Sequence, residues 1–458
     1  MRPPLLLPLE VAAARAAGRL SRVLGVGGGT TVPGKLLWKA DPGAIDRLAA
    51  RLPQGSALVS ATNGKTTTSA MVADILRTRV RLVHNASGAN LVSGVASTLL
   101  ASHGGELGLF EVDEAALPEV ARRVRPRAIC LGNLFRDQLD RYGELELVAE
   151  RWRGAVAALE PTAALVVNAD DPQVAHLADG RAGAVRFGVD DPRHARPLQH
   201  AADSTHCVRC GTSYDYAAAY VGHLGDYHCP SCGHARPRLD VAARSIELHG
   251  LSGASFELVT PSGSQAIELR LPGLYNRYNA TAAAARAESL GAALEEIAVG
   301  LARFSAAFGR SERIQIGDRG LLTLLIKNPA GANEVVRILV DGHDPPRVAV
   351  IALNDAIADG RDVSWIRDVD FEPLLDGLER LVATGERAAE LALRFKYAGM
   401  PEDAIEVVSD LERAFDRGLE LTPAGGELVV LPTYTAMLAL RRIIVGRGYA
   451  RQYWEKGQ

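Results

Sequence analysis

The sequence predicts an α/β protein in which a nucleotide-binding domain with a parallel-rich central sheet is followed by a smaller α/β domain. Short apolar runs alternate with helix-like stretches from about residue 57 to residue 200, which is the rhythm of parallel strands joined by crossover helices. A phosphate-loop-like string follows the first of these runs. The alternation is interrupted between about 203 and 237 and begins again beyond 314. At 458 residues the chain is also too long for a single core.

Composition and charge exclude several classes of protein. Hydrophobic residues make up 47% of the chain and charged residues 23%, as in ordinary globular proteins. A formal net charge of -3 gives no basic field, so we expect no nucleic-acid partner. No segment reaches the roughly 18 uninterrupted apolar residues of a transmembrane helix, and prolines interrupt the apolar start of the chain. We therefore expect a cytoplasmic protein that is not an integral membrane protein.

The string Ala61–Thr68, ATNGKTTT, lies between the expected strand 57–60 and a helix beginning near Ser69. In that setting backbone N–H groups at a helix N-terminus face an anion, Lys65 reaches the terminal phosphates, and the Thr66 hydroxyl holds Mg²⁺. The string is shorter than the full Walker pattern, whose first glycine would stand at Val59. The expected nucleotide-binding residues here are Thr62, Asn63, Gly64, Lys65, Thr66 and Thr67.

Two CxxC pairs, Cys207/Cys210 and Cys229/Cys232, are separated by 18 residues within the interrupted region. Two such knuckles can present four thiolates to Zn²⁺ tetrahedrally, and a closed site of this kind is structural rather than catalytic. We expect a zinc ribbon inserted over 203–237. Cys130, the one remaining cysteine, follows an apolar run and is expected in the core.

The string ATNGKTTT resembles the phosphate loop of the Mur ligase and folylpolyglutamate synthase superfamily, and further strings match that superfamily in order. The resemblance implies a Mg²⁺-binding role for Glu111 in GLFEVDE and nucleotide contacts from the NADDP, NRYNA and FGRSER strings. The residues implied in these three strings are Asn168, Asp170, Asn276, Asn279 and Arg310.

The ribbon and two later strings narrow the resemblance to the MurT family. KNPAGANE at 327–334 and DGRDVSW at 359–365 are similar to runs of the MurT C-terminal domain, and the likeness extends over nearly the whole chain. It implies a Mur ligase middle domain over 1–313, with the four-cysteine insertion at 203–237, and a MurT-type α/β domain over 314–458.

The sequence departs from amino-acid-adding Mur ligases in three respects. Gln138 stands where those enzymes have a metal-binding histidine, and the following segment has no lysine for carbamylation, which puts a second metal site of their type in doubt. The first 50 residues leave no room for their UDP-binding domain. Substrate recognition must therefore be organised differently.

The MurT resemblance implies ATP-dependent amidation of the D-glutamate α-carboxylate of lipid II to D-isoglutamine, through an acyl phosphate. ATP, Mg²⁺ and a structural Zn²⁺ are the implied cofactors, with Lys65 and Glu111 as catalytic residues. The chain has no evident glutaminase to supply ammonia, so the resemblance implies a GatD-type glutamine amidotransferase subunit as partner in a heterodimer. Because lipid II is membrane-linked, peripheral association with the inner face of the membrane is a further expectation.

In the MurT family an aspartate of the C-terminal domain is thought to orient the histidine of the glutaminase. Four aspartates are candidates here, and we favour the pair in DGRD, with Asp362 ahead of Asp359, because both follow the expected strand 347–353. At least two of the four are expected to be ordinary turn or capping residues. The other two candidates are Asp355 and Asp368.

The sequence leaves two other hypotheses open. The chain could be a ligase that adds an amino acid, as folylpolyglutamate synthase does, although Gln138 and the ribbon disfavour it. It could also be a non-catalytic scaffold with a vestigial ATP site, which the joint presence of Lys65, Thr66 and Glu111 disfavours.

Overall fold

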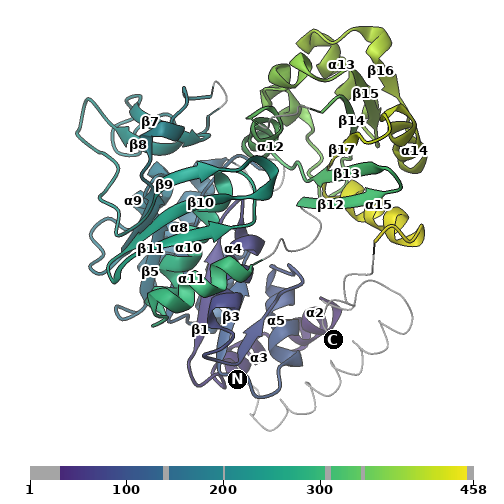
Figure 1. Ribbon diagram of the computed structural model, residues 1–458. Helices are drawn as coiled ribbons and strands as arrows, with labels where there is room; N and C mark the ends of the chain where they lie inside the picture. Colours follow the sequence, from purple (N-terminus) through teal and green to yellow (C-terminus); the bar gives the residue numbers. More distant parts are fainter. Residues whose placement is uncertain (1–30, 138–143, 200–201, 305–310, 342–345, 451–458) are drawn as a thin grey trace.

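The chain folds into two α/β domains, each with its own sheet, in a computed structural model (Figure 1). The structure describes residues 31–137, 144–199, 202–304, 311–341 and 346–450. Within these ranges no helix is both long and apolar enough to cross a membrane. The α/β fold class predicted from the sequence is confirmed.

The first domain is built on a nine-stranded sheet of order β11-β10-β9-β6-β5-β4-β1-β3-β2. Strands β1 to β6 and β9 run parallel, and β10 and β11 form an antiparallel edge. The central strand β1 lies between β3 and β4, so the carboxyl ends of these strands open a crevice where the direction of winding reverses. The strands are β1 (Ser56–Ser60), β2 (Leu82–His84), β3 (Leu107–Glu111), β4 (Ala128–Leu131), β5 (Ala164–Asn168), β6 (Val185–Val189), β9 (Val241–Leu248), β10 (Ala254–Thr260) and β11 (Gly263–Leu269).

Helices cover both faces of this sheet, and the alternation of side chains along each strand supplies both cores. In β1, Val59 packs into the core under α4, α10 and α11, whereas its neighbour Leu58 packs into the core under α2, α3, α5, α6 and α8. The helices are α2 (Val32–Ala40), α3 (Ala44–Ala49), α4 (Lys65–Leu76), α5 (Val92–Ala101), α6 (Leu117–Val124), α8 (Leu145–Ala157), α9 (Pro172–His176), α10 (Tyr275–Ser289) and α11 (Leu294–Arg303).

A two-stranded hairpin of β7 (Asp215–Val221) and β8 (Leu224–His228) stands apart from the large sheet, between β6 and β9 in the chain. The four cysteines of the CxxC pairs flank this hairpin, two before β7 and two after β8. It projects beside the first domain on the side of α9 (Figure 1).

The second domain contains a six-stranded sheet of order β12-β13-β17-β14-β15-β16, parallel except for the β12–β13 hairpin. The expected domain boundary at residue 314 falls inside β12, which pairs with β13 from Ser311 onward, so the boundary lies before Ser311. The elements are β12 (Ser311–Ile316), β13 (Arg319–Leu324), β14 (Val348–Ala352), β15 (Arg380–Thr384), β16 (Ile405–Val407), β17 (Glu427–Pro432), α12 (Pro329–Asp341), α13 (Ala388–Ala398), α14 (Leu411–Leu421) and α15 (Tyr434–Gly446).

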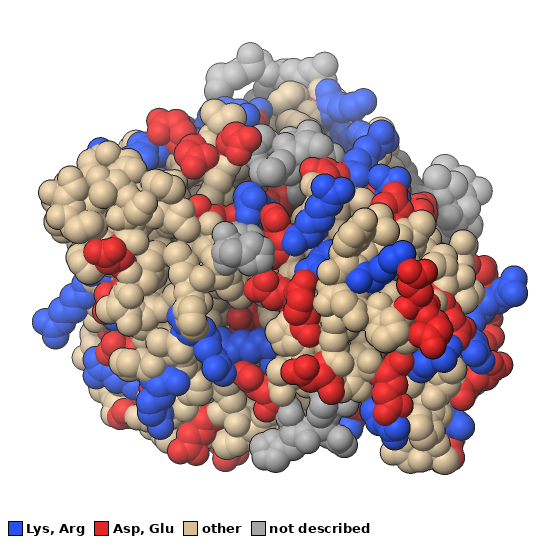
Figure 2. All heavy atoms as spheres, turned by 90° about the horizontal axis from the view of Figure 1, so that it is seen from above, with Lys and Arg blue, Asp and Glu red and all other residues tan. Residues whose placement is uncertain are grey.

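Helix α12 joins the two domains. Arg337 donates a hydrogen bond of 2.9 Å to the carbonyl oxygen of Tyr220, and the amide of Asn333 donates one of 3.2 Å to Gln199. Seen from above, a hollow separates the two lobes, and side chains of both signs are mixed over this face without a broad area of one charge (Figure 2). This view agrees with the near-neutral composition.

Glu334 of α12 is buried at this junction, and one of its carboxylate oxygens has no hydrogen-bond partner among the described residues. Burial raises the pKa of Glu334 from its usual 4.5 to about 7, although Arg337 opposes the shift. An acid whose pKa is higher in the folded chain stabilises it only while protonated, and this contribution is lost as pH rises through the folded pKa.

We expect Glu334→Gln to remove a pH dependence of stability. The wild-type chain should lose stability between pH 5.5 and pH 8, and the variant should be more stable at pH 8 by up to about 3 kcal/mol, the upper limit set by this pKa shift. Urea unfolding at the two pH values measures this, with the exposed Glu295→Gln as control. If the free energy of unfolding changes with pH equally in wild type and Glu334→Gln, ionisation of Glu334 does not destabilise the folded chain.

Candidate functional site

The string 61–68 follows β1 as expected, but α4 begins at Lys65, four residues before the start expected near Ser69, so Lys65 and Thr66 lie in the first turn of the helix. Gly64 has φ of 84°, and a Cβ there would stand 2.0 Å from the side-chain oxygen of Asn279. Only glycine satisfies both the left-handed backbone and this close approach. Thr66 and Thr67 follow in the first helical turn, so the N-terminus of α4 faces the loop.

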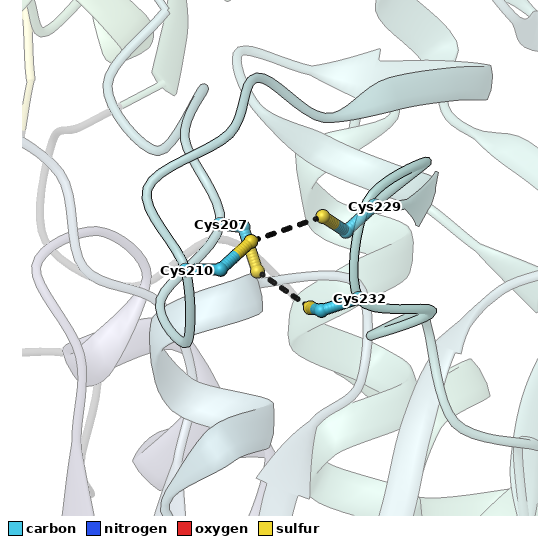
Figure 3. A group of neighbouring side chains, drawn as sticks. All are labelled: Cys207, Cys210, Cys229 and Cys232. Carbon is cyan, nitrogen blue, oxygen red and sulfur yellow. Dashed lines mark hydrogen bonds between the residues drawn. The ribbon is translucent and has the colours of Figure 1, made fainter.

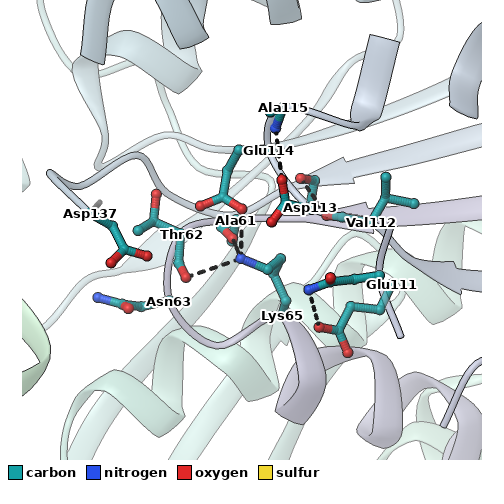
Figure 4. A network of polar contacts seen from close by, with 12 residues as sticks. Ala61, Thr62, Asn63, Lys65, Glu111, Val112, Asp113, Glu114, Ala115 and Asp137 are labelled. Carbon is teal, nitrogen blue, oxygen red and sulfur yellow. Dashed lines mark hydrogen bonds and ion pairs between the residues drawn. The ribbon is translucent and has the colours of Figure 1, made fainter. Parts of the chain in front are cut away.

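Lys65 is buried within the loop (Figure 4). Its ammonium group donates to the carbonyl oxygens of Ala61 and Thr62, at 2.5 and 3.2 Å, and pairs with the carboxylate of Glu114 at 2.7 Å. Burial alone would lower the pKa of Lys65, yet the carboxylates of Glu114 and Asp113 outweigh it and leave that pKa above its usual value. Lys65 therefore remains a cation throughout the physiological pH range.

Glu111 and Thr66 have the chemistry of a magnesium site. Glu111 ends β3, is almost completely buried, and accepts one hydrogen bond of 3.3 Å from Asn90. The Thr66 hydroxyl is buried and has no hydrogen-bond partner among the described residues. Carboxylate and hydroxyl oxygens are ligands that Mg²⁺ accepts, so these two side chains fit the ion.

A pocket of about 280 Å³, counting space open to solvent, adjoins the loop at the carboxyl ends of β1, β4 and β5. Asn63, Asn168 and Asn279 line it, and the Asn168 amide nitrogen is buried without a partner among the described residues. Asn276 stands behind this wall and accepts a hydrogen bond of 3.0 Å from Asn279. The NADDP and NRYNA strings thus meet at one pocket, as a nucleotide site requires.

Asp170, which the sequence predicts to contact the nucleotide, does not line the pocket. It is fully buried and accepts hydrogen bonds from Tyr278 at 2.6 Å and from Arg236 at 3.2 Å. Burial raises the pKa of Asp170 to about 6. Its geometry makes it a support beneath the pocket rather than a ligand. The expected contact from Arg310 and the departure at Gln138 lie outside the described residues.

The second domain reaches this site through two residues to which sequence reasoning gave no role. The side-chain amides of Asn328 and Asn63 exchange two hydrogen bonds, of 3.0 and 3.1 Å, and Lys327 pairs with the buried Asp137. Burial raises the pKa of Asp137, and Lys327 opposes that shift. In the sequence, the KNP string carries only a family resemblance. Glu114 was likewise missed, although the acidic run EVDE was a visible signal.

The four cysteines converge at one point (Figure 3). The sulfur atoms of Cys207 and Cys232, and those of Cys210 and Cys229, are 3.5 Å apart, and all four lie within 4.8 Å of one another. Disulfide bonds need about 2.05 Å, whereas sulfurs around tetrahedral zinc, at about 2.3 Å from the ion, stand roughly 3.8 Å apart. The arrangement fits a four-thiolate metal site.

The two favoured aspartates have different environments. Asp359 is buried, and its two carboxylate oxygens accept from the backbone N–H and the hydroxyl of Thr435, so it caps the start of α15 instead of facing a partner. Asp362 is exposed and accepts from the backbone N–H of Ser364. Hydrogen bonds from the Ser364 side chain and from this N–H lower the pKa of Asp362. Of the other two, Asp355 pairs with Arg387 and Asp368 with Arg136.

Family models match both domains. The Mur ligase middle domain matches residues 59–228, and the MurT ligase C-terminal domain matches residues 325–437. The MurT subunit of lipid II isoglutaminyl synthase (glutamine-hydrolyzing) from Streptococcus pneumoniae is 33% identical over 445 residues, covering 95% of this chain and 97% of that protein. The MurT subunit from Staphylococcus aureus is 31% identical, covering 93% and 94%.

Solved structures show the same fold. A pseudomurein peptide ligase type C from Methanothermus fervidus superposes with a TM-score of 0.67 at 22% identity, covering 88% of this chain and 80% of that chain. The MurF ligase from Thermotoga maritima in complex with ADP gives a TM-score of 0.63 at 14% identity, covering 92% and 83%.

The Lys65–Glu114 pair predicts that Glu114 competes with nucleotide phosphates for the ammonium group. Glu114→Gln should therefore bind Mg²⁺-free ADP five- to thirtyfold more tightly, as expected if about 1–2 kcal/mol of competing interaction is lost. Isothermal titration measures this. The exposed Glu295→Gln is the control, because it removes a carboxylate that is not among the groups acting on Lys65. Weaker binding by Glu114→Gln would contradict the competition.

Proposed function

Because the chain belongs to the MurT family of ATP-dependent ligases, we propose that it amidates the D-glutamate α-carboxylate of the lipid II stem peptide, in peptidoglycan synthesis, with ammonia from a glutaminase partner. The observation that carries this proposal is the buried Lys65 of the loop, paired with Glu114, together with the contact that the MurT-type C-terminal domain makes with the same loop through Asn328 and Asn63.

The chemistry follows from the poor leaving group of a carboxylate. A carboxylate oxygen attacks the γ-phosphorus of ATP, and the bond between this phosphorus and the oxygen that bridges to the β-phosphate breaks. The products are an acyl phosphate and ADP. The nitrogen lone pair of ammonia then attacks the carbonyl carbon, phosphate leaves, and a proton is lost from nitrogen. Both steps develop charge on phosphate oxygens, which positioned cations and N–H groups stabilise.

Each part of the loop has a role in this scheme. Lys65 would leave Glu114 for the terminal phosphates, while the N–H groups at the start of α4 face the same anion. Thr66 and Glu111 would hold Mg²⁺, which supplies neutralising charge when bound. The pocket lined by Asn168 and Asn279 would take the nucleoside end, with Asp170 and Arg236 fixing its wall from beneath.

The four-cysteine cluster would hold Zn²⁺ in a structural role, because four thiolates leave no open position on the metal.

A GatD-type glutamine amidotransferase is proposed as the partner subunit, since the MurT relatives are named as subunits of a glutamine-hydrolysing synthase. Cys130 is not suited to be the nucleophile of a glutaminase within this chain, because burial raises the pKa of its thiol to about 12. Action on lipid II would bring the complex to the inner face of the membrane from the cytoplasm.

Mass spectrometry of the muropeptide tests the reaction. With a glutaminase partner, ATP, Mg²⁺, glutamine and lipid II, we expect a product lighter by about one mass unit, since OH is replaced by NH2. Lys65→Ala should abolish the product, because phosphoryl transfer depends on positioned charge. ATP consumption with unchanged mass would point to another acceptor, and the absence of ATP consumption would favour a scaffold.

Asp362 is proposed to orient the histidine of the partner glutaminase, because it is the exposed member of the DGRD pair. Asp362→Asn should lower glutamine-dependent amidation at least tenfold and leave amidation with free ammonium within twofold. Asp359→Asn is the contrasting variant, since it should lower the melting temperature by weakening the cap on α15. Equal loss with glutamine and ammonium in Asp362→Asn would contradict the assignment.

A further inference from the structure

The tip of the β7–β8 hairpin packs against Phe135 and Asp171, beside the segment that contacts the phosphate loop. Gly222 and His223 form the tip, and the His223 side chain is completely buried although it belongs to an inserted segment. Its imidazole lies 3.3 Å from the carboxylate of Asp171 and packs on the ring of Phe135, with centroids 4.8 Å apart. A Cβ at Gly222 would stand 2.9 Å from that same ring.

The residues beneath the tip hold the phosphate loop. Asp171 accepts the backbone N–H of Leu134 at 2.8 Å, and the backbone N–H of Phe135 donates to the Thr62 hydroxyl at 3.1 Å. Asn133 forms two hydrogen bonds with the backbone of Asn63, of 2.8 and 3.1 Å. Residues 133–135 are therefore clamped between the hairpin tip and the loop.

At its other end the hairpin runs into the four cysteines. Cys229 follows β8 directly, and β7 begins shortly after Cys210. The hairpin itself is braced by Tyr216, whose hydroxyl donates to the carbonyl oxygen of His223 at 2.9 Å, and whose ring lies 6.3 Å from that of the buried Tyr227. A further hydrogen bond connects the hairpin to the first domain, since the backbone N–H of Gly225 donates to the carbonyl oxygen of Asp170 at 2.9 Å.

We propose that His223 is a positioning residue for the phosphate loop, and that zinc binding in the ribbon and MgATP binding at the loop are coupled through it. The coupling rests on the zinc and ATP sites of the proposed function. Zinc orders the knuckles, the knuckles fix the hairpin, and the buried tip fixes residues 133–135 against Thr62 and Asn63.

Thermodynamic reciprocity gives this coupling a measurable form. If ribbon zinc strengthens MgATP binding by some factor, MgATP strengthens zinc binding by the same factor. If the ribbon has only a local role, zinc should leave the affinity for MgATP unchanged, which corresponds to a factor of one. We expect at least fivefold, a value typical of coupling between sites joined by packed elements.

The experiment uses the full-length chain and a non-hydrolysable ATP analogue with Mg²⁺. Zinc loss to a chelator, followed with a metal-sensitive dye, should slow at least fivefold when the analogue is bound. His223→Ala should keep one zinc per chain, bind the analogue at least fivefold more weakly, and show no such slowing. Asp215→Ala is the matched control, because Asp215 is exposed on β7 and should behave as wild type.

The outcomes separate the coupling from the sites it joins. Zinc loss unaffected by the analogue, or full analogue affinity in His223→Ala, would overturn the inference while leaving the ligase intact. If the chain binds no zinc, the zinc site itself fails, and analogue affinity in His223→Ala still decides the role of the tip. If His223→Ala does not fold, His223→Phe, which keeps the packing on Phe135 and loses the contact with Asp171, takes its place.

Discussion

Burial of the Lys65 ammonium within its own loop is the constraint on which the rest of the site depends. A buried cation is costly unless it is paired and hydrogen-bonded, and this chain meets that condition with two loop carbonyls and Glu114. The pairing holds the loop in shape without a ligand. A phosphate binding there would replace one anion by another, so the buried Lys65 would not be left unpaired.

A buried ion pair of the same kind also holds the second domain in position. Asp137 is buried beside this cluster, and its partner, Lys327, comes from the segment between β13 and α12. The adjacent amides of Asn328 and Asn63 add a contact that depends on both domains being in place. A charge-paired junction of this kind favours one arrangement of the domains, since separating them would leave two charges unpaired.

Local strings predicted the parts of the site that local structure builds. Gly64, Lys65 and Thr66 could be placed because a strand and a turn fix their geometry within eight residues, although the helix starts four residues earlier than expected. The cysteines could be placed because ligand spacing is itself the signal. Contacts between distant segments gave no such pattern. Asp170 looked like a nucleotide ligand in its string, yet Arg236 and Tyr278, 66 and 108 residues away, occupy it. His223 carried no signal, because its partners become neighbours only in the folded chain.

The carboxyl ends of the second sheet carry two segments that lie near the first domain. Lys327 follows β13, whereas Asp362 follows β14 and accepts from Ser364 at the start of a 3-10 helix, Ser364–Asp368. At the far end of that helix Asp368 pairs with Arg136 at 3.4 Å, next to Asp137. Five residues of 3-10 helix span only about 10 Å. A partner seated on Asp362, as proposed above, would therefore lie beside the helix that pairs with Arg136, next to the segment whose Asn133 holds the phosphate loop.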